Sequence, residues 1–431
     1  MRLALLAVAV LAAYAASLPA AFQFDDYNVI VRNPAVQNWA ALAGELGHGL
    51  RPALKVSYAL NWTLGDGEPW GFHAFNVLIH AANACLAYCV GLRLARRWSV
   101  GTPDAIWLAA LVFALHPVQT EAVTYISGRS TSLAATFYLG AVLVYLRAGP
   151  AWASLALFAL ACATKETALT LPAALLLCEA ASPQPVDWRA VARRQWMYWV
   201  LAAALLAVPL AHERYARFAE AAFSQRSIAD NLLSQVQGVG YLVSRLFLPT
   251  RLNIDPALPA LSAWDGALAL QAAGLAALLA IGLASLRARP WLGFGLCWFF
   301  LHLLPTNSLV PRVDIANERQ LYLALWGLAL ALAIALPARA AKPAALVLAL
   351  VLAPLGIARQ LEYRTEIALW EASVREAPWN ARAYNNLGFA RALAGDPEGA
   401  IRAYREALAF NPADETARYN LAQALAGRPP R

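Results

Sequence analysis

Long runs of hydrophobic residues alternate with short polar segments along the first 358 residues of the chain. A helix needs about 20 mostly apolar residues to cross a bilayer, and somewhat fewer when it packs inside a bundle. Eleven runs fit this requirement: 3–21, 71–92, 105–117, 131–147, 151–164, 167–181, 196–211, 265–286, 291–304, 320–336 and 343–358. The pattern predicts an all-α fold in which residues 1–358 form a polytopic membrane helix bundle of about 11 spans.

The positive residues between these runs predict how the helices cross the membrane. Cytoplasmic loops are enriched in Lys and Arg, and a cytoplasmic N-terminus places every positive cluster on that side. The clusters are Arg2; Arg93, Arg96 and Arg97; Arg147; Arg189, Arg193 and Arg194; Arg287 and Arg289; and Arg339 and Lys342. This threading requires the apolar segment 228–249 to lie along the interface or re-enter; if it spans, the C-terminus becomes cytoplasmic.

The same threading predicts which segments lie on the outer side. They are 22–70, 117–130, 165–166, 212–264, 305–319 and all residues after 359. These segments hold most of the unusual acidic and amide residues, so we expect the protein to work on that side. We interpret 3–21 as an uncleaved first span, with a cleaved signal peptide as the alternative.

Composition agrees with a bilayer protein. Apolar residues make up 60% of the chain and charged residues 14%, whereas about a quarter of a soluble domain is charged. The net charge of +8 is spread between apolar runs, so it does not indicate nucleic-acid binding. The five cysteines lie in apolar stretches without metal-ligand spacing, which is typical of small buried side chains.

The C-terminal segment 359–431 has the composition of a soluble helical domain. Its residues match the 34-residue tetratricopeptide spacing at Tyr384, Leu387, Gly388, Ala400, Tyr404, Ala407 and Pro412. One full repeat with half a repeat on each side is fewer than the three or so that a free-standing array needs. We therefore expect this segment to lean on the membrane domain, either as a peptide-binding surface or as a structural lid.

Two adjacent carboxylates, Asp25 and Asp26, directly follow the first apolar run. Carboxylates at a membrane exit cost desolvation energy unless they are paired or solvated, so this pair is a candidate functional site. The alternative is a polar cap that only marks the interface.

A polar stripe follows one face of the second apolar run. Its members are His73, Asn76, His80 and Asn83, at positions i, i+3, i+7 and i+10. Such a stripe should face the bundle interior or a wet cavity. Since two turns separate the histidines and no carboxylate is spaced to join them, we expect no metal.

Two further polar clusters lie in the predicted outer turns. One runs from His116 to Glu121 and is followed by Arg129, and the other is Lys165–Glu166. Cations on this side need anionic partners. Those partners are either the two glutamates, in a structural network, or a phosphate. The sequence has no P-loop, GxSxG or HExxH motif, so it does not support nucleotide hydrolysis or acyl transfer.

Several of these segments together resemble a known family. They are FQFDDYNVIVRNPAV, RPALKVSYALN, GFHAFNVLIHAAN, FALHPVQTEAVTYISGR, ATKETALTLPAALLLCE, LNIDPALP and LPTNSLVPRVDIANERQLYLALWG. The chain resembles the transmembrane and tetratricopeptide-repeat O-mannosyltransferases, relatives of protein O-mannosyltransferases in the GT-C glycosyltransferase superfamily. The resemblance covers most of 20–330 and, with the repeats, reaches the C-terminus, although the repeat array is shorter than in those relatives.

The resemblance implies an inverting glycosyltransferase of the inner (cytoplasmic) membrane. It would move a sugar from a polyprenyl-phosphate-linked donor to a hydroxyl of an exported polypeptide on the periplasmic side, where the repeats would present the acceptor. By position, Asp26 is the expected general base and Asp25 the second choice. Arg129, Lys165 and Arg319 are the expected donor-phosphate ligands.

The remaining candidates are expected to orient the substrates, without a metal or other cofactor. They are His116, Glu121, Glu166, His73, Asn76, His80 and Arg51. Three alternatives stay open: the same chemistry on a lipid or glycan acceptor, a non-catalytic scaffold that recruits partners through its repeats, and a transporter. Transporters usually place ionisable groups near the midplane and have repeated halves, whereas the polar residues here lie in loops.

Overall fold

The computed structural model describes the chain except for residues 48–49, 211–216, 218–219, 221–222, 225 and 429–431. Parts of the predicted span 196–211, of the predicted loops 22–70 and 212–264, and of the segment 359–431 therefore lie outside the described residues. The described part is built from helices and contains no strand, which confirms the all-α class.

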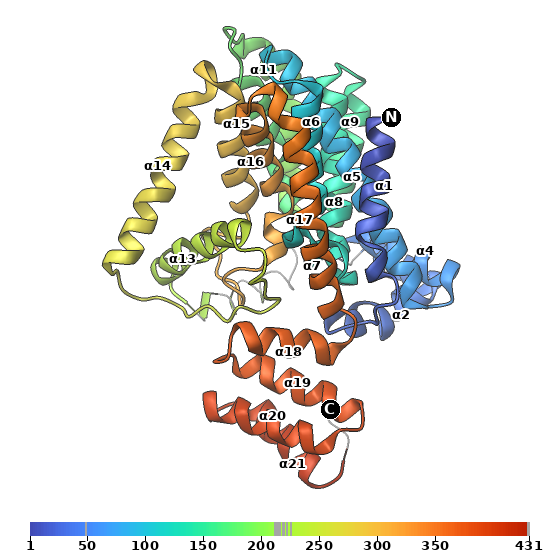
Figure 1. Cartoon of the computed structure of the whole chain (residues 1–431). Helices are drawn as coiled ribbons and strands as arrows, with labels where there is room; N and C mark the ends of the chain where they lie inside the picture. Colours follow the sequence, from blue (N-terminus) through green and yellow to red (C-terminus); the bar gives the residue numbers. More distant parts are fainter. Residues whose placement is uncertain (48–49, 211–216, 218–219, 221–222, 225, 429–431) are drawn as a thin grey trace.

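Each predicted run coincides with a helix. These helices are α1 (Arg2–Ala13), α5 (Pro69–Trp98), α6 (Pro103–Leu115), α8 (Arg129–Leu146), α9 (Ala151–Thr164), α10 (Leu171–Ala180), α11 (Trp188–Leu210), α14 (Gly266–Ala288), α15 (Pro290–Leu303), α16 (Leu321–Ala335) and α17 (Ala341–Glu362). Figure 1 shows them as one bundle, with the N-terminus at the end away from the repeats.

Several helices are long and apolar enough to cross a membrane, which makes the chain a multi-pass membrane protein. In the described part of the chain they are Pro69–Trp98, Gly266–Ala288, Glu318–Ala335 and Ala338–Glu362. A fifth span would be the pair Pro103–Leu115 and Pro117–Val123, which is bent by 52°. Length and composition therefore support four or five spans, and the predicted number of 11 is not confirmed.

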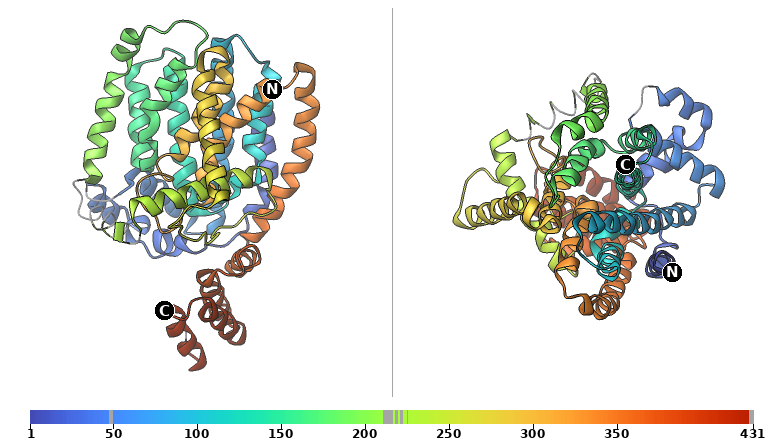
Figure 2. Two further views of the ribbon diagram at one scale, coloured as in Figure 1. Left: turned by 90° about the vertical axis from the view of Figure 1, so that its left-hand side faces the viewer. Right: turned by 90° about the horizontal axis from the view of Figure 1, so that it is seen from above.

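Further helices, outside the predicted runs, cover the end of the bundle that faces the repeats. They are α2 (Pro34–Gln37), α3 (Trp39–Leu46), α4 (Pro52–Gly65), α7 (Thr120–Val123) and α13 (Ile228–Phe247). The Asn33 and Asn38 side chains cap α2 and α3 by accepting backbone N–H groups. Both side views show α13 running across the direction of the bundle helices (Figures 1 and 2).

Small residues let the bundle helices pack closely where α15 meets α16. A Cβ on Gly295 would lie 2.6 Å from the carbonyl oxygen of Gly327. Trp298 and Trp326, both almost completely buried, fill the space beside this contact with rings whose centroids are 5.1 Å apart. The contact joins the centre of the bundle to the segment before α16, which contributes to the site described below.

The described helices of the repeat segment lie beyond the end of the bundle (Figure 2). They are α18 (Glu366–Glu376), α19 (Ala381–Leu393), α20 (Pro397–Phe410) and α21 (Glu415–Leu425). Gly388 lies so close to the Tyr404 ring that a Cβ would be 2.6 Å from it. The predicted first and second helices of the repeat thus pack through the motif positions, as the spacing requires.

The repeats dock on the loops that connect the bundle helices at this end. Arg382 pairs with Asp255 and Asp314, each at 2.6 Å. The Asn253 and Ser373 side chains bond at 2.7 Å, and Asn253 also donates to the Ser373 carbonyl at 3.2 Å. The first helices of the segment therefore lean on the membrane domain, as expected of an array too short to stand alone.

Candidate functional site

Asp26 is a buried carboxyl that links the loop after α1 to the turn before α8. Its side chain is 1% exposed. One carboxyl oxygen accepts from the Ser127 N–H at 2.8 Å and the Ser127 hydroxyl at 2.5 Å, and the other accepts from the Gln23 N–H at 3.1 Å. Burial raises the pKa of Asp26 to about 7, although the bonds from Ser127 act in the opposite direction.

Asp25 differs from its neighbour because its carboxylate is available. The residue is half-buried, and its N–H donates to the Tyr125 hydroxyl at 3.1 Å. No described residue makes a hydrogen bond or ion pair with its side chain. The negative charge of Asp25 acts on Arg319. A general base must be reachable by substrate, so this geometry favours Asp25 over Asp26, the reverse of the order predicted from the sequence.

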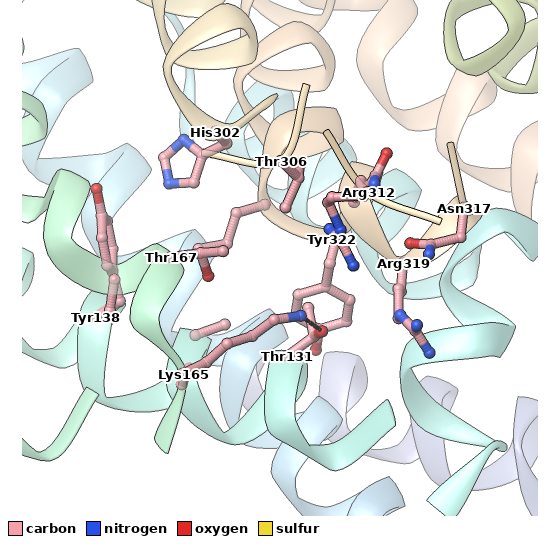
Figure 3. A pocket seen from close by; sticks show the side chains of 15 residues that line it. Thr131, Tyr138, Lys165, Thr167, His302, Thr306, Arg312, Asn317, Arg319 and Tyr322 are labelled. Carbon is pink, nitrogen blue, oxygen red and sulfur yellow. Dashed lines mark hydrogen bonds between the residues drawn. The ribbon is translucent and has the colours of Figure 1, made fainter. Parts of the chain in front are cut away.

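A polar cavity of about 60 Å³ opens beside Arg319. Its walls come from α8, the turn after α9, α15, the loop before α16 and the first residues of α16. Lys165, Arg312 and Arg319 line it, and the described lining includes no acidic residue. Figure 3 shows the Lys165 and Arg312 side chains extending toward its centre from opposite sides. This charge balance suits an anion.

Lys165 enters the cavity where α9 ends. Its backbone is extended there, and its amino group donates to the Thr131 hydroxyl at 2.6 Å. Burial, followed by the positive charges of Arg319, Arg51 and Arg312, lowers the pKa of Lys165 well below its ordinary value. A bound anion would reverse this effect by favouring the charged ammonium.

The two arginines of the cavity are held differently. The Arg319 N–H donates to Glu121 at 2.9 Å, and its guanidinium lies 3.4 Å from the other oxygen of the same carboxylate. Glu121 is 1% exposed, so it fixes the direction of Arg319. The Arg312 side chain makes no hydrogen bond or ion pair with the described residues, and burial lowers its pKa. Arg312 is therefore free to bind a ligand.

Uncharged polar groups without partners form another wall of the cavity. Both amide atoms of Asn317 and both of Gln320 are buried without a partner in the described part of the chain. His302 donates from Nδ1 to the Trp298 carbonyl at 3.0 Å, which leaves its Nε2 as an unpaired acceptor. Buried polar groups are normally satisfied, so this wall indicates a ligand that carries donors and acceptors.

Arg129 is part of the protein interior. It is 0% exposed and donates to the Asn76 side chain at 2.7 Å and to the carbonyls of Ser57 and Phe72 at 3.1 and 3.0 Å. Its guanidinium also lies 4.8 Å from the centre of the Tyr58 ring. These contacts do not support the predicted phosphate-binding role, because the donors are already used to join α4, α5 and α8.

The polar stripe of α5 faces the bundle interior, as predicted. His73 bonds to the Ala20 carbonyl at 3.0 Å, and Asn83 donates to the Tyr322 hydroxyl at 2.9 Å. His80 Nε2 donates to the Ala114 carbonyl at 2.9 Å, so its Nδ1 accepts from Tyr322 at 2.7 Å. Among the described residues, Tyr322 links the stripe to the cavity, and the other hydrogen bonds of the stripe go to neighbouring helices and to the segment after α1.

The remaining predicted residues hold segments around the cavity in place. Arg51 and Glu166 form a two-bonded pair at 2.9 and 2.8 Å next to Lys165. His116 accepts from the Val118 N–H at 3.2 Å and bonds to the carbonyl of Leu246 at 3.1 Å, at the end of α13. Among the described residues, no group of three or more His, Cys, Asp or Glu side chains is placed to hold a metal ion.

Arg312, Asn317, Gln320 and His302 were not singled out from the sequence. The first three lie in the segment LPTNSLVPRVDIANERQLYLALWG, which carried part of the family resemblance. The available signal was therefore a cation and an amide in a predicted outer loop, with a second amide at the first residue of the following predicted span. His302 lies inside an apolar run, where nothing in the sequence separates a ligand-facing histidine from a packed one.

Comparison with known proteins gives relatives that are named protein O-mannosyl-transferases. Mouse "Protein O-mannosyl-transferase TMTC1" is 35% identical over 42% of this chain and 22% of its own length. Drosophila melanogaster "Protein O-mannosyl-transferase Tmtc2" is 35% identical over 38% of this chain and 20% of its own length. Mouse "Protein O-mannosyl-transferase TMTC4" is 28% identical over 91% of this chain and 64% of its own length.

The C-terminal helices also match a family. The TPR repeat model matches residues 390–427, which cover the end of α19 and the whole of α20 and α21. No solved structure matches the chain. The chain spans about a fifth of the length of the first two relatives and 64% of mouse TMTC4. It is thus similar to the TMTC proteins over most of its own length and carries a TPR repeat.

Proposed function

We propose that this TMTC-like membrane protein is a glycosyltransferase that moves a sugar from a polyprenyl-phosphate-linked donor to a Ser or Thr hydroxyl of an exported protein. The observation that carries the proposal is the cavity lined by Lys165, Arg312 and Arg319. The Asp25 carboxylate, which has no hydrogen bond or ion pair among the described residues, is near enough for its charge to act on Arg319. The names of the relatives make mannose the first sugar to test.

The acceptor side of the reaction needs a base. Asp25 takes the proton from the acceptor hydroxyl, and the resulting oxygen attacks the anomeric carbon of the sugar from the face opposite the phosphate. The new glycosidic bond forms as the bond between the anomeric carbon and the phosphate oxygen breaks. The configuration at the anomeric carbon is therefore inverted, and the proton leaves Asp25 to water after product release.

The donor side of the reaction needs positive charge. The donor phosphodiester carries one negative charge, and the polyprenyl phosphate that leaves carries a second. Lys165, Arg312 and Arg319 stabilise this added charge inside a partly dehydrated cavity, where such contacts are stronger than in water. Since the leaving group is already a phosphate, the reaction needs no protonated acid.

The uncharged wall fits the sugar. Asn317 and Gln320 each offer donors and an acceptor, and His302 Nε2 offers an acceptor. Sugar hydroxyls are both donors and acceptors, so they satisfy groups that the folded chain leaves unpaired. The cavity volume accommodates only a few water-sized groups, so the phosphate and the adjoining part of the sugar occupy it.

We also propose the predicted topology of eleven spans with a cytoplasmic N-terminus, in which the positive clusters gather at one end of the bundle. Arg2 and Lys342 both contact Asp104, and Arg97 and Arg194 both contact Glu179. In Figure 1 the N-terminus lies at the end of the bundle away from the repeats. This arrangement favours an inner-membrane protein with its site, repeats and interfacial helix α13 on the periplasmic side.

The test follows the glycosylation of exported proteins in cells that lack the chain or express wild type, Asp25→Asn or Asp66→Asn. Asp66 is the matched control because it is exposed, lies in the same predicted loop and has φ 49°, which asparagine tolerates. We expect a hexose-sized mass on exported proteins with wild type and Asp66→Asn, and its loss in the other two strains.

Other outcomes identify the alternatives. Loss of a sugar from a lipid or glycan in the same two strains would retain the chemistry and replace the acceptor. Unchanged protein, lipid and glycan masses would contradict the transferase and favour a scaffold that recruits partners through its repeats.

A further inference from the structure

The backbone directly before Asp25 is held by the first helix of the repeat segment. The Phe24 N–H donates to the carboxylate of Glu366 at 2.9 Å. The Phe24 ring meets the Trp370 ring edge to face, with centroids 5.3 Å apart. Glu366 and Trp370 lie four residues apart on α18, so both present the same face of that helix to Phe24.

Neighbouring residues extend this contact on both sides. The Ala21 N–H donates to the Arg364 carbonyl at 3.3 Å, and the Gln23 side-chain amide donates to the Tyr363 carbonyl. Tyr363 and Arg364 lie in the link between α17 and α18. The link between the bundle and the repeats therefore holds residues 21–24 in place, directly before the two carboxylates.

The backbone conformation of Phe24 requires stabilising contacts. Its φ is 46°, a left-handed conformation that bulky residues rarely adopt. Such a conformation persists only where surrounding contacts hold it, and it occurs often at functional sites. Relaxation to negative φ would turn the following peptide and move the Asp25 side chain away from its present direction.

The Glu366 carboxylate is directed at the backbone of Phe24. Among the described residues, the Phe24 N–H is the hydrogen-bond donor to this side chain. Burial raises the pKa of Glu366, and the Phe24 N–H acts against that rise. This carboxylate is half-buried and bonds to a backbone N–H of another segment. We therefore interpret it as a structural contact between the repeat and the loop after α1.

We propose that Glu366 and Trp370 are positioning residues for Asp25. Helix α18 holds Phe24 in its left-handed conformation and thereby sets the direction of the Asp25 carboxylate. This inference rests on the proposed function, in which Asp25 is the base. It makes the repeat segment part of the catalytic apparatus as well as a surface for partners.

The test uses the full-length protein in detergent, with polyprenyl-phosphate-linked mannose and Ser/Thr peptides as substrates. We expect Glu366→Ala to lower kcat roughly 10- to 100-fold, because small displacements of a reacting group have effects of this size. The KM for the donor should not change. Glu366→Gln keeps an acceptor oxygen and should restore most of kcat.

Hydrogen–deuterium exchange gives a readout that does not depend on transfer. Exchange of the amides of residues 21–27 should be faster in Glu366→Ala and unchanged in Glu366→Gln. Glu371→Ala is the matched control, since Glu371 lies on the same helix and pairs with Arg391 within the repeats. It should leave both readouts unchanged.

The outcomes separate this inference from the proposed function. If wild type transfers mannose but Glu366→Ala keeps full kcat and wild-type exchange, the inference is wrong and the transferase stands. If wild type transfers no sugar, the proposed function fails, and unchanged exchange in Glu366→Ala would also overturn the role of α18 as a clamp.

Discussion

Asp26 is expected to make the protein less stable as the pH rises from 5 to 8. An aspartate in an unfolded chain has a pKa of about 3.9, and burial raises the pKa of Asp26 to about 7 in the folded protein. The folded state therefore holds the proton more tightly, so this stabilisation is present at low pH and is lost as the pH rises through 7. By the linkage relation, the contribution of Asp26 to the free energy of unfolding falls by about 3 kcal/mol between pH 5 and pH 8.

The assay compares wild type with Asp26→Asn, which has nearly the same shape and cannot ionise. Tryptophan fluorescence during heating, in one detergent at pH 5, 6, 7 and 8, gives an apparent Tm for each protein. We expect the Tm of wild type to fall across this range more steeply than that of the variant. Other buried carboxyls titrate in both proteins, so the difference isolates Asp26. Equal slopes would refute the raised pKa and the buried environment that causes it.

The remaining predictions separate ligand-binding cations from structural ones. Lys165→Met should weaken binding of polyprenyl phosphate roughly 10- to 100-fold, since hydrogen bonds to charged groups contribute about 1.5–3 kcal/mol; unchanged binding by titration with the lipid would remove Lys165 from the phosphate site. Arg129→Lys should lower the apparent Tm and the yield of folded protein, because a lysine leaves buried carbonyls without donors at a cost of about 1–3 kcal/mol each. The folded fraction should keep its affinity for polyprenyl phosphate, and loss of affinity with an unchanged Tm would return Arg129 to the phosphate site.

The spacing of the repeat residues predicted the repeat itself but not its contacts with distant parts of the chain. The spacing identified Gly388 and Tyr404 as motif positions of the repeat, and the structure brings these two residues into contact. The spacing also indicated that the repeats are too few to fold as a free-standing array. It did not indicate that α18 would contact Phe24, because that contact joins residues more than 340 positions apart in the sequence. Pairings of this kind depend on how the helices between them pack.

Hydrophobic periodicity determined where helices form and which face of α5 is buried. Both properties are local, since they depend on the number of apolar residues and on the repeat of 3.6 residues per turn. The sequence alone therefore predicted the helical class, the repeat, and the inward direction of His80 and Asn83.

Only the tertiary structure decided which charged residues remain available to a ligand. Asp25 and Asp26 are adjacent and chemically identical, yet the donors from Ser127 and Gln23 engage only the second carboxylate. The Arg129 guanidinium donates to carbonyls of two other helices. Arg312 lies on an irregular loop, and its guanidinium makes no hydrogen bond or ion pair with the described residues. The availability of a charge depends on the groups that folding brings around it, and those groups come from distant parts of the chain.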